Sequence, residues 1–234
     1  MEPAVPVEDT TAELVKLVAR WSALFVRSVE LSAAAGRGRA PDGVWLLGEG
    51  NVQIRERLAH VEARCRRSVR ALQPGGPFDP TDDEPERDAL SRRRGIRMEM
   101  VAPERAGVVN PYLRTVNPHA RCGPVLGPAI LVDDVCAVLP GVPTRQGGNT
   151  AWVFTRPEVV ADVVALWRTT AQLSRPATET AWPRLTTRQF TIARERALGR
   201  THAAIARAVG ISERTVSHEL AEVDRRVRTL VPAG

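Results

Sequence analysis

The sequence lacks the features of membrane-spanning and secreted proteins. No apolar run approaches the roughly 20 residues that are needed to cross a bilayer. The N-terminal segment is acidic and contains prolines, whereas a signal peptide begins with basic residues followed by an apolar run. These absences predict a cytoplasmic protein with no membrane partner.

Sequence motifs that are typical of metal and cofactor sites are missing as well. The cysteines, Cys65, Cys122 and Cys136, are widely spaced and contain no CxxC pair, which argues against a disulfide framework and a zinc site. The four histidines show no metal-ligand spacing, and neither a GxGxxG motif nor a P-loop occurs. The sequence therefore predicts neither a metal nor a cofactor.

Aromatic residues and lysine are both scarce. Aromatic residues make up only 4% of the chain, so a core must consist mostly of Val, Leu, Ile and Ala. Lys16 is the only lysine among 33 basic residues, a bias that fits a GC-rich coding genome. The abundance of arginine is therefore no evidence of arginine-specific chemistry.

The positive charge is concentrated near the C-terminus. The formal net charge is +6, and residues 185–234 hold nine arginines against five acidic residues, a formal charge of +4. A local excess of this kind favours a surface that binds a polyanion.

The chain divides into four parts. Residues 1–43 contain a predicted amphipathic helix over 10–35, in which Thr10 and Glu13 have capping-box spacing. Residues 44–173 read as an α/β regulatory domain, 174–184 as a linker with two prolines, and 185–234 as an all-α domain. The apolar face expected on the first helix consists of Leu14, Val18, Trp21, Phe25 and Val29.

The α/β domain is predicted from the alternation of two hydrophobic periods. Asp133 and Asp134 separate two apolar runs, which indicates a β-hairpin with a two-residue turn. Helices are expected over 51–66, 83–94 and 157–170, and strands over 68–72, 96–101, 129–132, 135–139 and 151–154.

Capping residues divide the C-terminal segment into three short helices. Thr186 and Gln189 have capping-box spacing, and Thr201 begins a second helix over 202–209. Gly210 supplies the left-handed turn, after which Ser212 caps a third helix. The pattern is that of a helix-turn-helix, while a helical bundle that binds protein instead of DNA remains an alternative.

These residues resemble the LuxR-type DNA-binding domain, as found in regulators of the actinobacterial type. The match runs from Leu185 through Gly199 and the segment 210–216 to Leu220. The resemblance implies a recognition helix from Glu213 to about Val227, lying in the major groove. Its residues expected to face base edges are Ser217, His218 and Ala221. Those expected to approach phosphates are Thr201, Arg214 and Thr215, and charge alone adds Arg200, Arg207, Arg225 and Arg226.

The resemblance implies a transcriptional regulator that binds promoter DNA as a homodimer. By family analogy it would activate a gene cluster for a specialised metabolite such as an antibiotic. The LuxR-type domain normally has a fourth helix that is often used in dimerisation, and no such helix is expected here. Dimer contacts are therefore expected upstream. The alternative is a sigma-factor-like protein that acts with core RNA polymerase. The sequence identifies no small-molecule effector.

The hairpin also gives the middle domain a fainter resemblance to a phospholipase-D-like sensor module. Catalytic members of that family carry HxKxxxxD, in which the Asp lies at the hairpin. Here the His and Lys positions hold Leu126 and Pro128, or Gly127 and Ala129 in the other register. The nucleophile and the phosphate-binding cation are both missing, so a domain without enzymatic activity is expected. A nuclease or phosphodiesterase is the alternative, and the acidic residues 82–84 and 133–134 are interpreted as solvated loops.

Overall fold

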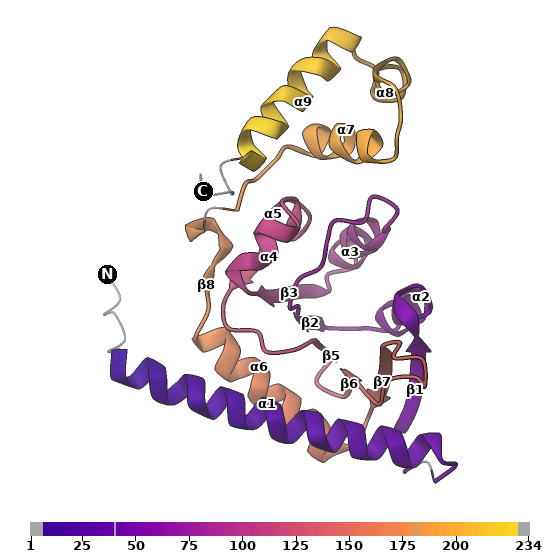
Figure 1. The fold of residues 1–234 in the computed structure, drawn as a ribbon, viewed down its shortest axis with the longest axis vertical. Helices are drawn as coiled ribbons and strands as arrows, with labels where there is room; N and C mark the ends of the chain where they lie inside the picture. Colours follow the sequence, from indigo (N-terminus) through magenta and orange to yellow (C-terminus); the bar gives the residue numbers. More distant parts are fainter. Residues whose placement is uncertain (1–6, 40, 181, 229–234) are drawn as a thin grey trace.

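A single mixed sheet of eight strands organises the protein (Figure 1). The computed structural model describes residues 7–39, 41–180 and 182–228. The strands lie in the order β1-β7-β6-β5-β2-β3-β4-β8. Strands β2, β3 and β4 are parallel, and all other neighbours are antiparallel. Their bounds are β1 Val44–Glu49, β2 Ser68–Leu72, β3 Arg97–Ala102, β4 Arg121–Cys122, β5 Ala129–Val132, β6 Cys136–Pro140, β7 Thr150–Phe154 and β8 Arg175–Pro176.

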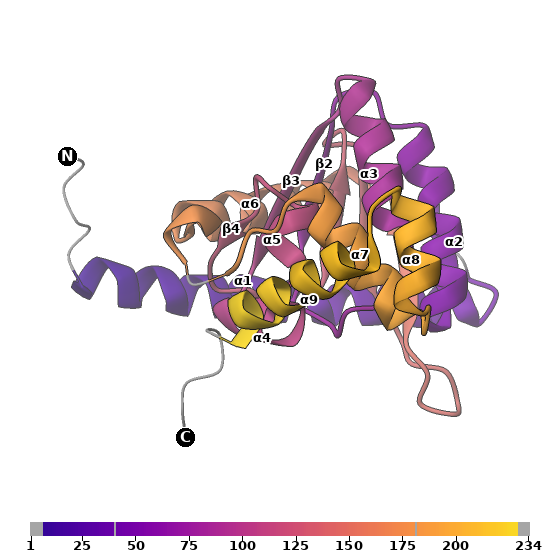
Figure 2. The same ribbon diagram turned by 90° about the horizontal axis from the view of Figure 1, so that it is seen from above.

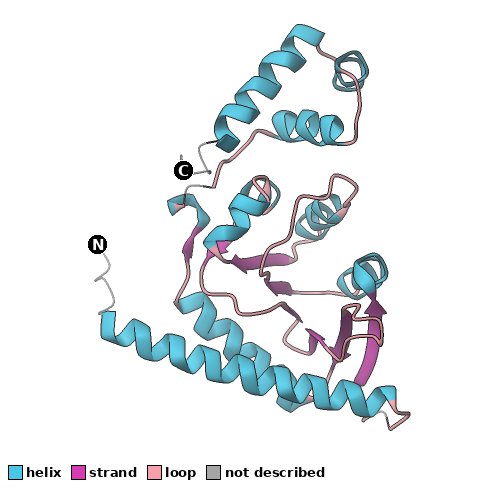
Figure 3. Ribbon diagram, in the orientation of Figure 1, coloured by secondary structure: helices cyan, strands magenta, loops and turns pink. Residues whose placement is uncertain are grey.

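Helices cover both faces of this sheet (Figure 3). Helices α1 (Val7–Gly36) and α6 (Pro157–Gln172) pack on one face, and α2 (Gly50–Ala63) and α3 (Glu84–Arg93) on the other. Two short helices, α4 (Glu104–Val109) and α5 (Leu113–Val116), follow β3. The chain is therefore a mixed α/β protein with an N-terminal helix, as its sequence predicts.

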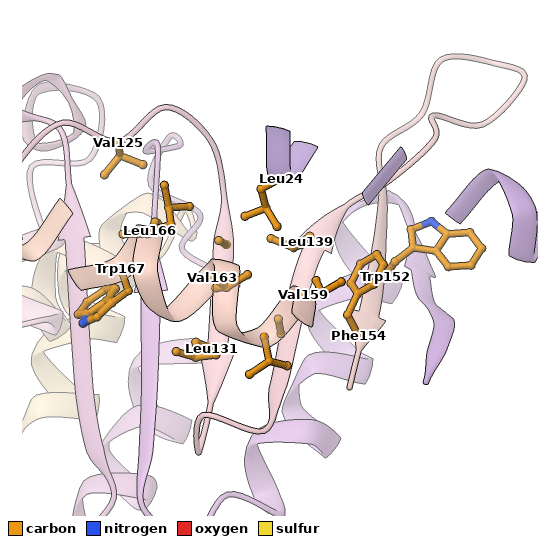
Figure 4. Packing of buried hydrophobic residues seen from close by; sticks show 14 of the residues in the cluster. Leu24, Val125, Leu131, Leu139, Trp152, Phe154, Val159, Val163, Leu166 and Trp167 are labelled. Atoms are coloured by element: carbon orange, nitrogen blue, oxygen red, sulfur yellow. The ribbon is translucent and has the colours of Figure 1, made fainter. Parts of the chain in front are cut away.

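The largest core cluster lies between the sheet and the α1–α6 layer. Phe154 and Val159 are fully buried in it, and Trp152 and Trp167 lie near its edges (Figure 4). The remaining members shown are aliphatic, so a chain that is poor in aromatic residues concentrates several of them here. This burial supplies most of the apolar contacts that hold α1 and α6 to the sheet.

The predicted hairpin is confirmed. Strands β5 and β6 are antiparallel neighbours. Asp133 and Asp134 lie in the turn that joins them and have φ angles of 53° and 58°. Aspartate tolerates this left-handed backbone better than most residues, which is why the turn could be recognised from sequence.

Helix α1 buries a different face from the one that the sequence predicts. Leu17 and Leu24 are 1% and 2% exposed, whereas Val18 and Phe25 of the predicted face are 51% and 40% exposed. Trp21 lies at the boundary, where its ring packs on Gly127 so closely that a Cβ there would lie 1.9 Å from the ring. The helix is apolar over more than one stripe, so periodicity alone could not choose the stripe that meets the sheet. The side chain of Thr10, and with it the expected capping box, lies outside the described residues.

The segment predicted as a linker over 174–184 is in fact packed. Strand β8 pairs with β4, and a 3-10 turn over Ala177–Glu179 follows. Trp182 is only 2% exposed and donates a hydrogen bond from Nε1 to the carbonyl of Glu104 at 2.9 Å. Its ring lies against Gly107, where a Cβ would be 2.1 Å away. The prolines here end regular structure without leaving the segment loose.

Three further helices complete the chain, and they lie together at one end of the molecule (Figures 1 and 2). They are α7 (Thr187–Ala197), α8 (His202–Val209) and α9 (Glu213–Arg228). They meet the sheet domain near the loop that follows β2, next to α3 and α5. We call α7–α9 the helical unit.

Candidate nucleic-acid interface and adjoining cavity

The turns of the helical unit are built by the residues that the sequence singles out. Thr186 Oγ1 accepts from the backbone N–H of Gln189 at 3.2 Å, and the Gln189 side chain accepts from the Thr186 N–H at 3.1 Å. Thr201 caps α8 by accepting from Ala204 N–H, and Gly210 ends α8 with φ of 73°. These contacts set the lengths of α7 and α8 and direct the chain sharply into α9.

A small core fixes how α9 lies in this unit. Ile192, Ile205 and Val216, one from each helix, are fully buried. Glu219 is 7% exposed, and its carboxylate accepts from Arg188 at 2.6 Å and from the Gln189 amide at 3.0 Å. Because one side of α9 is held by these contacts, its opposite side is left on the surface.

The surface side of α9 is polar and basic. Its residues recur at spacings of three and four, so they share one face of the helix. We call this the α9 outer face, and it consists of Arg214, Ser217, His218, Ala221, Arg225 and Arg228, all exposed, with the exposed carboxylate of Asp224 at its edge. Arg228 was not singled out by sequence reasoning, although its helical spacing from Arg214, Ala221 and Arg225 was a usable signal.

Two of the predicted interface residues point elsewhere. Arg226 donates to the Arg184 carbonyl at 3.0 Å and to Glu222 at 2.7 Å, so it joins α9 to the segment before α7. Thr215 is half-buried and within 2.8 Å of the Ser212 hydroxyl, which caps α9 through the Thr215 N–H. Both were chosen by position or charge, and neither criterion shows where a side chain is anchored.

The other predicted residues lie on or beside the turn. Thr201 is exposed at the start of α8, and Arg207 is exposed on that helix. Arg200 is paired with Glu195 at 2.6 Å. Ser217 on the α9 outer face lies 3.1 Å from Nδ1 of His202, a contact that links α8 to α9.

A cavity of about 110 Å³ lies where the helical unit meets the sheet domain. We call it the junction cavity. Gly75 and Gly76 bound it beyond the end of β2, and Phe190 and Arg194 of α7 close another side. Its remaining lining includes Phe78, Asp82, Glu84, Asp88, Asn110, Tyr112 and Asn117.

Three carboxyl groups at or near this cavity, of which Glu84 and Asp88 line it, have raised pKa values. Burial, followed by the nearby carboxylate of Asp88, raises the pKa of both Glu62 and Glu84 to about 7. Burial also raises the pKa of Asp88, against the lowering effect of Arg92, which pairs with it at 3.1 Å. The interpretation of residues 82–84 as solvated loop is therefore wrong for Glu84, because the helical unit and α3 remove it from water.

Arg194 is the main polar link across the junction. Its guanidinium donates to the carbonyls of Pro80 at 2.8 Å and Asp82 at 2.9 Å, and it also pairs with Glu86. Two carbonyls of the loop before α3 and one carboxylate of α3 hold α7 in a single position. Within the described ranges, no group of three His, Cys, Asp or Glu residues is placed to hold a metal ion.

Asp133, the first residue of the hairpin turn, is held by the backbone that leads into β2. The Asp133 carboxylate accepts from the backbone N–H groups of Arg66, Arg67 and Ser68 at 2.7–2.9 Å. Burial raises the pKa of Asp133, but these hydrogen bonds and one from the Cys65 thiol outweigh it and lower the pKa to about 2. The carboxylate therefore anchors the start of β2 and is not a freely solvated loop group.

Comparison with solved structures finds similar folds at low identity. A phospholipase D family member, Nuc from Salmonella typhimurium, is 15% identical and has a TM-score of 0.45, covering 57% of this chain and 96% of that one. The archaeal chromatin protein TrmBL2, whose structure shows a mode of DNA binding, is 10% identical with a TM-score of 0.46, covering 73% and 67%. Phosphatidylserine synthase from Haemophilus influenzae is 13% identical with a TM-score of 0.45, covering 71% and 46%.

The structures with similar folds include phospholipase D family members, at 15% identity or less. No family model and no curated protein matches the chain, so the resemblance to LuxR-type domains gains no support. No helix among residues 7–39, 41–180 and 182–228 is long and apolar enough to span a bilayer.

Two predictions are contradicted by the same comparison. The expected transcriptional regulator, with its promoter and gene-cluster role, is wrong, because the similar folds include a phospholipase D family member and a phosphatidylserine synthase. The expectation of a protein without enzymatic activity is contradicted by the same neighbours.

Proposed function

We propose that the helical unit binds double-stranded DNA, with α9 as a helix-turn-helix recognition helix in the major groove. The observation that carries the proposal is the α9 outer face, which is exposed, polar and basic on a helix whose other side is fixed. Helices of this kind enter the major groove, where the groove is wide enough to admit them.

The residues of this unit divide into two proposed roles. Ser217, His218 and Ala221 lie where a docked helix presents side chains to base edges. Arg214, Arg225 and Arg228 flank them and would pair with phosphates, as would Thr201 and Arg207 on and before α8. Arg200 lies beside this group and exchanges its pairing with Glu195 for a phosphate. Arg226 and Thr215 support the unit from within.

The proposal is tested by placing a carboxylate at the centre of the α9 outer face. Ala221→Glu is expected to weaken binding of a labelled 30-bp duplex about tenfold at about 0.05 M salt, since one added like charge opposes counterion release. Fluorescence anisotropy measures the affinity. The matched control is Ala161→Glu on the exposed side of α6, which should leave the affinity unchanged. Equal affinities for all three proteins would rule out α9 as the contact.

A second copy of the chain is the proposed partner of α1. Leu14, Val15, Val18, Phe25 and Val26 are all exposed along this helix, part of which extends beyond the sheet (Figure 1). A two-fold axis beside α1 would bury the same patch on both copies and set two helical units on one duplex.

The dimer is tested by sedimentation at about 10 μM protein, where a moderate interface is occupied. Val18→Glu with Phe25→Glu is expected to convert a dimer to a monomer, because two carboxylates would be buried without partners. Lys16→Glu with Arg20→Glu, on the exposed side of α1 away from this patch, should remain dimeric. A wild-type chain that sediments as a monomer would disprove the assignment.

A further inference from the structure

We propose that the junction cavity binds a small organic cation, an alkylammonium with a short chain, between Glu84 and the rings of Phe78, Tyr112 and Phe190. This site is separate from the α9 outer face. Its existence does not depend on whether DNA is the partner of the helical unit.

The first argument is a carboxyl group at the cavity that accepts no hydrogen bond from the residues that the structure describes. The Glu84 side chain lines the cavity and accepts no hydrogen bond from any residue in the described part of the chain. Behind it lies Glu62, which is 7% exposed and equally without a donor in the described residues. Carboxylates that are partly removed from water are normally paired, so half-buried Glu84 leaves room for a positive partner.

Arg87 is the cation that faces both Glu84 and Glu62, but no hydrogen bond joins it to either carboxyl group. Arg87 pairs with Asp83, Arg92 with Asp88, and Arg194 with Glu86. The carboxyl groups are too widely spread to hold a metal ion among the residues that are described. An organic cation suits such a site, because one ammonium group can donate three hydrogen bonds while its chain occupies the remaining space.

The second argument is the aromatic wall of the cavity. Phe78 and Tyr112 meet edge to face with ring centroids 4.5 Å apart, and Phe190 lies 6.1 Å from Phe78 and 5.8 Å from Tyr112. Aromatic faces attract ammonium groups and also shield an alkyl chain from water. Carboxyl groups and rings around one small space form the usual combination for recognising amines.

The volume limits the ligand. A cavity of roughly 150 Å³ holds benzene, so a cavity of 110 Å³ suits a ligand of about four non-hydrogen atoms. A ligand of that size has a dissociation constant no tighter than about tens of micromolar. Because α7 supplies Phe190 and Arg194, an occupied cavity holds this helix more firmly against the sheet domain.

The test uses isothermal titration calorimetry of the full chain with n-propylammonium, n-propanol and propionate at pH 8. Only the ammonium is expected to bind, at one site per chain. Its affinity should fall about tenfold at pH 6, because the pKa of Glu84 is about 7 and the carboxylate is mostly protonated there. The charged groups that face Glu84 are Glu62 on α2, Asp82 before α3, Asp88 and Arg87 on α3, and Arg194 on α7.

Variants distinguish recognition of the ammonium charge from apolar filling of the junction cavity. Glu84→Gln should weaken binding at least tenfold, and Glu56→Gln on the exposed side of α2 is the matched control. Phe190→Leu, which keeps apolar packing, should weaken binding several-fold and keeps the test open if the first variant unfolds. Hydrogen exchange of α7 amides should slow when propylammonium is bound. The proposal is overturned by equal binding of n-propanol or by unchanged affinity in Glu84→Gln. It is also overturned by no binding at 20 mM ligand, which is about 500 times the tightest dissociation constant expected.

Discussion

Replacing Trp182 with alanine is expected to lower the free energy of unfolding by about 3–5 kcal/mol. The indole is almost fully buried, lies against Gly107 and donates a hydrogen bond to the carbonyl of Glu104. Removing it leaves a cavity that the glycine backbone cannot fill and leaves that carbonyl without its donor. Urea unfolding followed by circular dichroism measures the loss.

The matched control for this variant is Trp45→Ala on the edge strand β1. The Trp45 side chain is 47% exposed, so its loss should cost about 1 kcal/mol or less. Comparing the two variants shows whether residues 174–184 form a packed junction or a loose linker. If residues 174–184 only connected two independent parts, Trp182→Ala would cost no more than Trp45→Ala, and the packed junction would be disproved.

Elements with strong local signals could be predicted from the sequence. Strand β2, strand β5 and helix α8 have the predicted bounds, because each is limited by turn or capping residues next to it in the chain. The hairpin turn was equally predictable, since Asp133 and Asp134 both tolerate a left-handed backbone. Such signals lie within a few residues of the structure that they determine.

Features that depend on distant partners could not be predicted. The burial of Trp182 requires Gly107, and the packing of Trp21 requires Gly127, yet no local pattern links either pair. Helix α1 shows the same limit, because its sequence offers two apolar stripes and only the position of the sheet decides which is covered.

The two candidate sites also differ in how far the sequence predicts them. The α9 outer face follows from helical spacing once Gly210 and Ser212 fix where α9 begins. The junction cavity takes Gly75, Glu84, Tyr112 and Phe190 from separate parts of the chain. The sequence places Glu84 in an acidic run, which normally indicates a solvated loop, and nothing nearby shows that α7 covers it.

Replacing both Arg214 and Arg225 with alanine is expected to weaken binding of duplex DNA about 30-fold at 0.15 M salt. Both arginines lie on the α9 outer face, and Arg225 gives up only a surface ion pair with Glu222. Each phosphate contact contributes roughly fivefold at this salt concentration through release of counterions. The slope of log affinity against log salt concentration should fall by about two, and anisotropy titrations from 0.05 to 0.3 M salt measure it.

The control for this prediction is a double variant with the same change in net charge. Arg145 and Arg168 are exposed, and they lie in the loop before β7 and on α6, away from the helical unit. If Arg145→Ala with Arg168→Ala lowered affinity and slope equally, the attraction would come from the overall charge of the protein. A loss confined to the α9 pair would mean that phosphates are held at fixed positions beside this helix. That outcome would bring Ser217 and His218 close to the duplex, because both lie between the two arginines on the same face.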